Sequence, residues 1–163
     1  MLDPLRPELL VLRMKKMNKG VNLPDQDHVI RYVSRQRLIV DGDNFLGFFP
    51  HAFKPRPIEN NSISVNWIEF FDGDHATRIK KAIHGMRVIK NIGKTSAFGI
   101  GNVGNIKNIS KKNGAVVKIV YAPNDGNPSH SLIRRLPEDN SFLLEALAND
   151  AFSERVLNSD IEE

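Results

Sequence analysis

Apolar and polar residues alternate from His28 to Val33, and a period of two residues predicts a β-strand there. Successive side chains of a strand point to opposite faces, so Val29, Arg31 and Val33 should share one face. The intervening residues, with Ile30 among them, should share the other face. The pattern therefore places an arginine and a histidine on opposite faces of one strand.

Four further segments have the composition of strands. Residues 37–40 lead through an Asp-Gly pair into residues 45–49, and Asp-Gly between apolar runs predicts a β-hairpin. Residues 62–71 are β-branched and aromatic, and residues 114–123 form an apolar run closed by a proline. The stretch between the hairpin and residue 62 is rich in proline, which favours a loop or an edge.

Two segments show helical spacing. Asp74 is a candidate N-cap, and the apolar residues after it predict a helix over about 74–91. Apolar residues also share one helical face over about 141–157, which predicts a second principal helix. The strands and helices do not alternate regularly, so the predicted fold class is α+β. We expect a single domain over residues 1–163 with a mainly antiparallel sheet.

Charge is unevenly distributed along the chain, whose net charge is +4. No Asp or Glu occurs between His75 and Asn124, although this stretch carries ten Lys and Arg residues. The sign reverses after Pro137, where Asp and Glu predominate. A stretch with no carboxylate cannot neutralise itself locally. Either the acidic part folds over it, or a positive surface remains for a polyanion such as nucleic acid.

The ends of the chain suggest contact surfaces. Residues 1–24 are predicted to be a docking segment, and residues 158–163 an acidic flexible tail. No apolar window approaches the roughly 18 residues needed to cross a bilayer, and the N-terminus lacks the pattern of a signal peptide. The absence of cysteine excludes disulfides and thiol chemistry. These features favour a bacterial cytoplasmic protein that does not bind a membrane.

Three motifs suggest a cofactor or a metal, but each has a simpler interpretation. Gly99 to Gly104 read G-x-G-x-x-G, which cradles pyrophosphate only where a strand leads in and a helix leads out. The following residues are rich in Asn, so glycines in a bent or bulged strand explain the motif better. The acidic residues of 41–44 and 72–75 lack metal-ligand spacing, which favours a turn and a helix cap. No metal site is predicted, and the residues do not specify a cofactor.

Two histidines are the acid–base candidates, because imidazole exchanges protons near neutral pH. His28 begins the first predicted strand. His130 follows Ser129 in a turn after the apolar run 114–123, and loops at strand ends frequently carry chemistry. We predict Ser129 as a ligand contact. A shared site requires the fold to bring these distant positions together.

Cationic and polar residues in three segments are candidates for binding an anion. Arg31 lies on the first predicted strand. Arg56 lies with Lys54 between prolines, and a stiff backbone loses little entropy when its cations bind an anion. Ser64 and Asn66 should share one face of their strand, which therefore has a polar row.

Four motifs together resemble a family of small bacterial proteins with the patterns H-V-x-R-Y-V, A-F-x-x-R-P, S-V-N-W-x-E and P-S-H-S-x-I-x-x-L-P. The resemblance spans residues 27–137. It implies an association with mobile-element or defence operons, and it implies no particular activity. The positions it marks are His28, Arg31, Arg56, Ser64, Asn66, Trp67, Glu69, Ser129 and His130.

A looser resemblance is to the Arg–Ser–Glu arrangement of ADP-ribosyltransferase-type enzymes. It implies that Arg31 grips an NAD phosphate and that Ser62 and Ser64 brace the nicotinamide pocket. Glu69 would then stabilise the oxocarbenium charge. The chain departs from that family because its Glu normally lies on a separate, later strand.

Three functions stay open on these grounds. The first is a binding module for nucleic acid or a nucleotide, and the second is an enzyme acting on a phosphorylated substrate or on NAD. The third is a non-catalytic adaptor or immunity-type protein with a partner protein. The sequence favours the phosphate-bearing ligand common to the first two, without deciding whether the protein is an enzyme.

Overall fold

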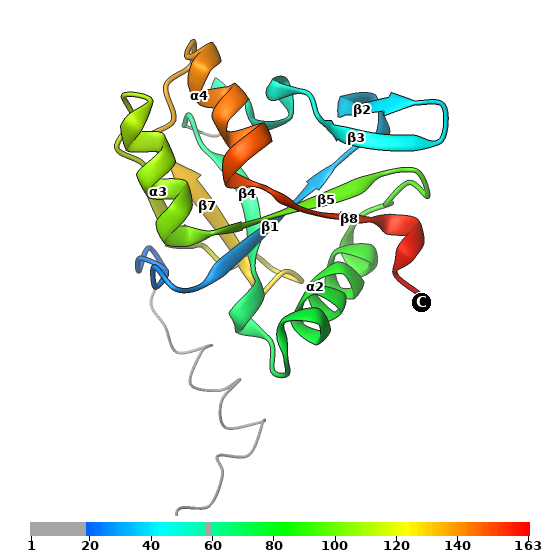
Figure 1. Ribbon diagram of the computed structural model, residues 1–163. Helices are drawn as coiled ribbons and strands as arrows, with labels where there is room; N and C mark the ends of the chain where they lie inside the picture. The colour runs from blue at the N-terminus through cyan, green and yellow to red at the C-terminus, as the bar shows by residue number, and fades with distance from the viewer. Residues whose placement is uncertain (1–18, 58–59) are drawn as a thin grey trace, which may run out of the picture.

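Six strands form an antiparallel sheet in the order β6-β7-β4-β1-β5-β8, and β2 and β3 form a separate hairpin (Figure 1). The computed structural model describes residues 19–57 and 60–163, so most of the predicted docking segment 1–24 lies outside the described residues. The strands are β1 (His28–Val33), β2 (Leu38–Asp41), β3 (Asn44–Phe48), β4 (Ile63–Trp67), β5 (Ala97–Asn102), β6 (Lys118–Tyr121), β7 (His130–Arg134) and β8 (Glu154–Leu157). The described α-helices are α2 (His75–Ile89), α3 (Val103–Lys112) and α4 (Ser141–Ala146). The predicted α+β single domain is confirmed.

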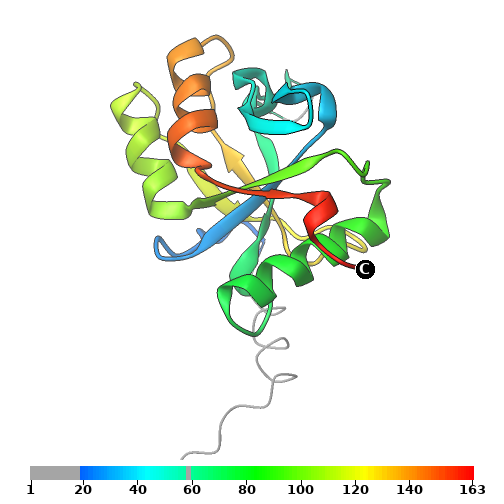
Figure 2. The ribbon, with the colours of Figure 1, turned by 45° about the vertical axis from the view of Figure 1, so that its right-hand side comes forward.

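The two faces of the sheet carry separate cores. Val29 and Val33 of β1 pack in the larger core with residues of α3, α4 and the hairpin. Ile30 packs in the smaller core against Ile83 and other residues of α2. Figures 1 and 2 show α2 on the opposite side of the sheet from α3 and α4. The alternation predicted for β1 therefore matches the two faces of the sheet.

The first predicted helix is confirmed, with Asp74 as its N-cap accepting a hydrogen bond from the Thr77 backbone N–H. The second prediction, over 141–157, is wrong at its C-terminal end. After α4 the chain makes a π-helical turn over Leu147–Ala151, and β8 then pairs with β5. A strand edge presents unpaired backbone groups, and β8 satisfies those of β5.

The helix α3 was not predicted, because its sequence is rich in Asn and has weak helix propensity. Asn102 caps it by accepting a hydrogen bond from the Asn105 backbone N–H. Val103 and Ile106 are fully buried in the larger core. Burial of this face therefore outweighs the unfavourable local propensity.

The end of the chain, predicted to be a flexible acidic tail, lies against α2. Arg87 donates hydrogen bonds to the backbone carbonyls of Asn158 and Ile161, and to that of Glu162. His84 contacts the same Glu162 carbonyl at 2.8 Å. Residues 158–162 thus contact α2 through their backbone carbonyls, and none of these hydrogen bonds involves a carboxylate.

The seam between β1 and β4 is closed at one end only. The two strands pair at Val29↔Trp67 and Ile30↔Asn66, whereas β1 pairs with β5 along its full length. Beyond Ile30 the strands separate. This opening in the middle of the sheet positions the candidate site.

Candidate anion-binding pocket

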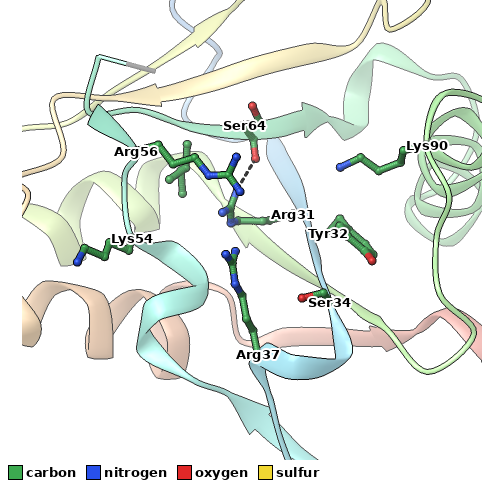
Figure 3. Close-up of a pocket in the computed structure, with 9 residues that line it drawn as sticks. Arg31, Tyr32, Ser34, Arg37, Lys54, Arg56, Ser64 and Lys90 are labelled. Atoms are coloured by element: carbon green, nitrogen blue, oxygen red, sulfur yellow. Dashed lines mark hydrogen bonds between the residues drawn. The ribbon is translucent and has the colours of Figure 1, made fainter. Parts of the chain in front are cut away.

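A cavity of about 310 Å³ occupies the open end of the β1–β4 seam (Figure 3). We call it the cation pocket, and its lining residues are Arg31, Tyr32, Ser34, Arg37, Lys54, Arg56, Ile63, Ser64 and Lys90. Five of these are Lys or Arg, and none is Asp or Glu. The pocket therefore concentrates positive charge where the two halves of the sheet diverge.

Arg31 bridges the opening between the strands. Its Nε donates to the Ala52 carbonyl at 2.9 Å, and its Nη1 donates to the Ser64 carbonyl at 2.8 Å. Its guanidinium also lies 5.9 Å from the centre of the Phe53 ring. In a continuous antiparallel sheet, the Ser64 carbonyl would be expected to pair with β1. The guanidinium replaces that pairing and holds the opening in place.

Three further cations of the pocket come from three different segments of the chain. Arg37 belongs to the short 3-10 helix before β2, Arg56 to the proline-rich loop, and Lys90 to the C-cap of α2. Figure 3 shows the guanidinium groups of Arg31, Arg37 and Arg56 converging, while the Lys54 ammonium points away from them. The Lys90 ammonium lies 4.8 Å from the centre of the Tyr32 ring.

The described ion pairs lie away from the cation pocket. Among residues 19–57 and 60–163 they are His28–Glu69, His75–Glu154 and Lys107–Asp25. None of these six residues lines the cation pocket. Like charges that converge repel one another, and an anion bound between them would relieve that repulsion.

A second cavity of about 210 Å³ adjoins the cation pocket and shares Arg31, Tyr32, Ser64 and Lys90 with it. We call it the histidine cavity, because His130 and Asn66 also line it. Asn66 and His130 are direct partners across β4 and β7, so their side chains leave the sheet on the same face.

The His130 ring is fixed by a contact at each nitrogen. Its Nδ1 lies 2.7 Å from the Ala122 carbonyl oxygen, and its Nε2 lies 3.1 Å from the Ser64 hydroxyl. A carbonyl oxygen can only accept, so Nδ1 carries a proton and donates it. In the neutral ring Nε2 is then an acceptor, and the Ser64 hydroxyl donates to it.

The turn before His130 is held by an amide of β4. Asn66 Nδ2 donates to Asn127 Oδ1 and to Ser129 Oγ, both at 2.7 Å. The Tyr121 hydroxyl donates to the Pro128 carbonyl at 2.8 Å, and burial raises the pKa of this phenol. These bonds tie residues 127–129 to the sheet.

Most of the residues predicted for a site lie along the two cavities, namely Arg31, Arg56, Ser64, Asn66 and His130. Ser129 is buried behind them, where it accepts the bond from Asn66. His28 lines neither cavity. The structure therefore does not bring the two predicted acid–base residues together.

His28 lies at the closed end of the seam in a separate polar cluster. Its backbone N–H donates to the Glu69 carboxylate at 2.6 Å, and its ring Nδ1 lies 2.8 Å from the other carboxylate oxygen. His75 contacts the same ring at 4.9 Å between centroids. The Trp67 indole donates to Asp27, and burial is the main cause that raises the pKa of this carboxyl. The Asp27 and Glu69 carboxylates are therefore bound by groups of the same cluster.

The glycine motif lies where β5 leads into α3, which was not predicted, but it has no room for a phosphate. A Cβ on Gly101 would lie 2.8 Å from the Ala151 carbonyl, and one on Gly99 would lie 2.9 Å from Phe48. The backbone N–H groups of Val103 and Gly104 donate to carbonyls of the segment before β1. The glycines therefore permit close packing, and the helix N-terminus is already satisfied.

Sequence reasoning missed Arg37, Lys90 and Tyr32 as site residues. Arg37 precedes an apolar strand, and Lys90 closes a predicted helix, so each had an ordinary explanation as a surface cation. Only the separation of β1 from β4 brings them together. No sequence pattern reports that separation.

The described residues contain neither a candidate metal site nor a candidate membrane-spanning helix. Among the residues that the structure describes, no group of three or more His, Asp or Glu side chains could hold a metal ion. No described helix combines the length and apolar character that crossing a membrane requires.

Comparison with family models, with curated proteins and with solved structures finds no match to this chain. The resemblance to a mobile-element or defence family therefore stays a prediction.

Proposed function

We propose that the protein binds a phosphate-bearing ligand, a nucleotide or a nucleic acid, in the cation pocket. One observation carries the proposal: five Lys and Arg residues and no described carboxylate line a single cavity. Guanidinium groups match the geometry of phosphate oxygens and donate two parallel hydrogen bonds to them. Arg37 and Arg56 would supply such donors from opposite walls.

The mouth of the pocket fits a ligand with more than one polar part. Tyr32 offers a ring at the boundary between the two cavities, and Ser64 and Asn66 offer polar groups beyond it. A phosphate bound by the guanidinium groups would leave the remainder of a nucleotide next to these side chains. This arrangement supports a phosphorylated organic ligand over inorganic phosphate alone.

The ADP-ribosyltransferase alternative has weaker support. Arg31 and Ser64 do line one pocket, as that resemblance implies, but the required carboxylate does not join them. Glu69 instead binds His28 at the closed end of the seam. A phosphate-binding role needs no carboxylate and accounts for Arg37 and Lys90 as well.

Calorimetric titration with pyrophosphate tests the proposal at low salt. We expect binding to the unmodified protein, and each of Arg37→Gln and Arg56→Gln should weaken it about tenfold, because each removes one charged donor. Lys111→Gln with Lys112→Gln is the matched control, since these exposed residues of α3 lie outside the pocket. The control should bind as the unmodified protein does.

A second titration separates the two ligand classes. If nucleic acid is the ligand, a short single-stranded oligonucleotide should bind. The logarithm of its affinity should fall by about 0.7 per contacted phosphate for each tenfold rise in salt. Tighter binding of ADP than of the oligonucleotide indicates a nucleotide. Absence of binding to pyrophosphate, ADP and oligonucleotide at low salt would show the proposal to be wrong.

A further inference from the structure

Ser64 stands where the cation pocket and the histidine cavity meet, and it is the residue that links their chemistry. Its backbone carbonyl faces Arg31 in the opening between the strands (Figure 3). Its hydroxyl lies 3.1 Å from Nε2 of His130. One residue thus adjoins both the positive charge and the imidazole.

The His130 ring is held in the tautomer that a general base requires. The Ala122 carbonyl accepts the proton of Nδ1, which leaves the lone pair of Nε2 directed at the Ser64 hydroxyl. His130 is 9% exposed, and the Asn66 bonds to the turn before it restrict its movement. A serine hydroxyl that donates to an oriented imidazole is an activated nucleophile.

From this geometry we infer that Ser64 and His130 form a nucleophile–base pair that hydrolyses a phosphate ester held in the cation pocket. The inference rests on the proposed function, because it takes the bound ligand to be the substrate. The electrophile is phosphorus rather than an acyl carbon, because guanidinium groups surround the pocket and stabilise phosphoryl oxygens as their charge shifts. Arg37 and Arg56 would supply that stabilisation.

The reaction balances with water as the only co-substrate. Ser64 Oγ attacks phosphorus as its proton passes to His130 Nε2, and the bond between phosphorus and the ester oxygen breaks. The imidazolium returns that proton to the leaving alcohol. A water molecule then attacks phosphorus as its proton passes to His130, the bond between phosphorus and Ser64 Oγ breaks, and His130 returns the proton to Oγ. A monoester substrate yields inorganic phosphate, and a diester yields a phosphate monoester.

The test uses p-nitrophenyl phosphate as a monoester and bis(p-nitrophenyl) phosphate as a diester. We expect the full-length protein to release nitrophenol from one of them and so to identify the ester class. Ser64→Ala should abolish release, and His130→Gln should reduce it by about a hundredfold or more.

Two controls separate chemistry from folding. Ser131→Ala removes a buried hydroxyl of β7, which donates to the Ser129 carbonyl. His84→Gln removes an exposed imidazole of α2. Both should hydrolyse the ester as the unmodified protein does.

Pyrophosphate titration of the unmodified protein distinguishes this inference from the proposed function. Mass spectrometry of the unmodified protein, quenched in acid during turnover, should detect a phosphoryl group on Ser64. Pyrophosphate binding without hydrolysis of either ester overturns the inference and leaves the binding function standing. Hydrolysis that survives in Ser64→Ala also overturns it. If the unmodified protein does not bind pyrophosphate, both the inference of hydrolysis and the proposed binding function are wrong.

Discussion

The two ends of β1 use polar residues in opposite ways. At its closed end, β1 pairs with both neighbours, and the carboxylates of Asp27 and Glu69 bind the nearby indole and imidazole. At its open end, β1 leaves β4, and Arg31 and other cations line the gap with no described carboxylate. The closed end thus joins carboxylates to hydrogen-bond donors, and the open end gathers cations.

This difference shows that a motif alone does not locate the proposed site. The glycine motif resembles a phosphate-binding loop, yet it lies beside the closed end, where His28 pairs with Asn102 and Val29 with Gly101. The cations of the proposed phosphate site gather at the other end, on segments that lack a phosphate-binding loop motif. Strand register decides which end is free to bind a ligand.

The largest effect is expected at Arg31, which is structural as well as cationic. Arg31→Met leaves the Ala52 and Ser64 carbonyls without their donor and should lower the free energy of unfolding by about 2–4 kcal/mol. Arg56→Gln, its exposed neighbour in the pocket, should change that free energy by less than about 0.5 kcal/mol. Urea denaturation of both variants measures the contrast. Equal effects would show that Arg31 does not bridge the seam.

The next effect tests the packing of the closed end. Gly101→Ala places a Cβ 2.8 Å from the Ala151 carbonyl and 2.9 Å from Ile106, which should cost about 1–3 kcal/mol of stability. Gly85→Ala meets no atom within 4 Å in the helix α2 and should stabilise by about 0.5–1 kcal/mol. Thermal unfolding with and without pyrophosphate checks both. If Gly101→Ala folds normally but loses pyrophosphate binding, the ligand binds at the glycine motif instead.

A smaller effect is expected when the closed end loses a charge. Glu69→Gln removes the carboxylate that accepts from the His28 backbone N–H and contacts its ring, at a cost of about 1 kcal/mol. Pyrophosphate affinity should stay within about twofold, because Glu69 lines neither cavity. Calorimetry on this variant measures the affinity. A large loss would mean that the two ends act as one site.

The smallest effect is a pH dependence at Asp27. Burial raises the pKa of this carboxyl above its usual value of 3.8, so the folded state retains a proton that the unfolded state has lost. The contribution of Asp27 to the free energy of unfolding therefore falls as pH rises from 3.8 to the raised pKa of the folded state. Above that pKa the loss of stability is constant. Asp27→Asn should gain stability relative to the unmodified protein as pH rises from 3.8. Urea unfolding across acidic pH checks the sign, and a relative loss would contradict it.

Much of the fold could be predicted from the sequence because its signals are local. The alternation along β1, the Asp-Gly hairpin and the Asp74 cap all act between near neighbours. The helix α3 and the strand β8 could not be predicted, because burial in the larger core and pairing with β5 override local propensity.

The candidate site was predicted in part for the same reason. Arg31 and Ser64 stood out as polar residues on the faces of predicted strands, and His130 stood out as a histidine in a predicted turn. Ser64 contacts both Arg31 and His130 in the structure. His28 stood out equally but pairs with Glu69. The sequence around His28 and His130 does not predict their different partners, because those partners come from strands that are distant in the sequence.

The central claim is that the open end of the seam binds a phosphate-bearing anion, and amide chemical shifts during pyrophosphate titration test it most directly. Binding there should shift the amides of Arg31–Ser34, of Arg37, of Lys54 and Arg56, of residues 62–64 and of Lys90. The amides of the glycine motif, Gly99–Gly104, should stay unchanged. Shifts confined to that motif, or spread over the exposed lysines of α3, would contradict the account.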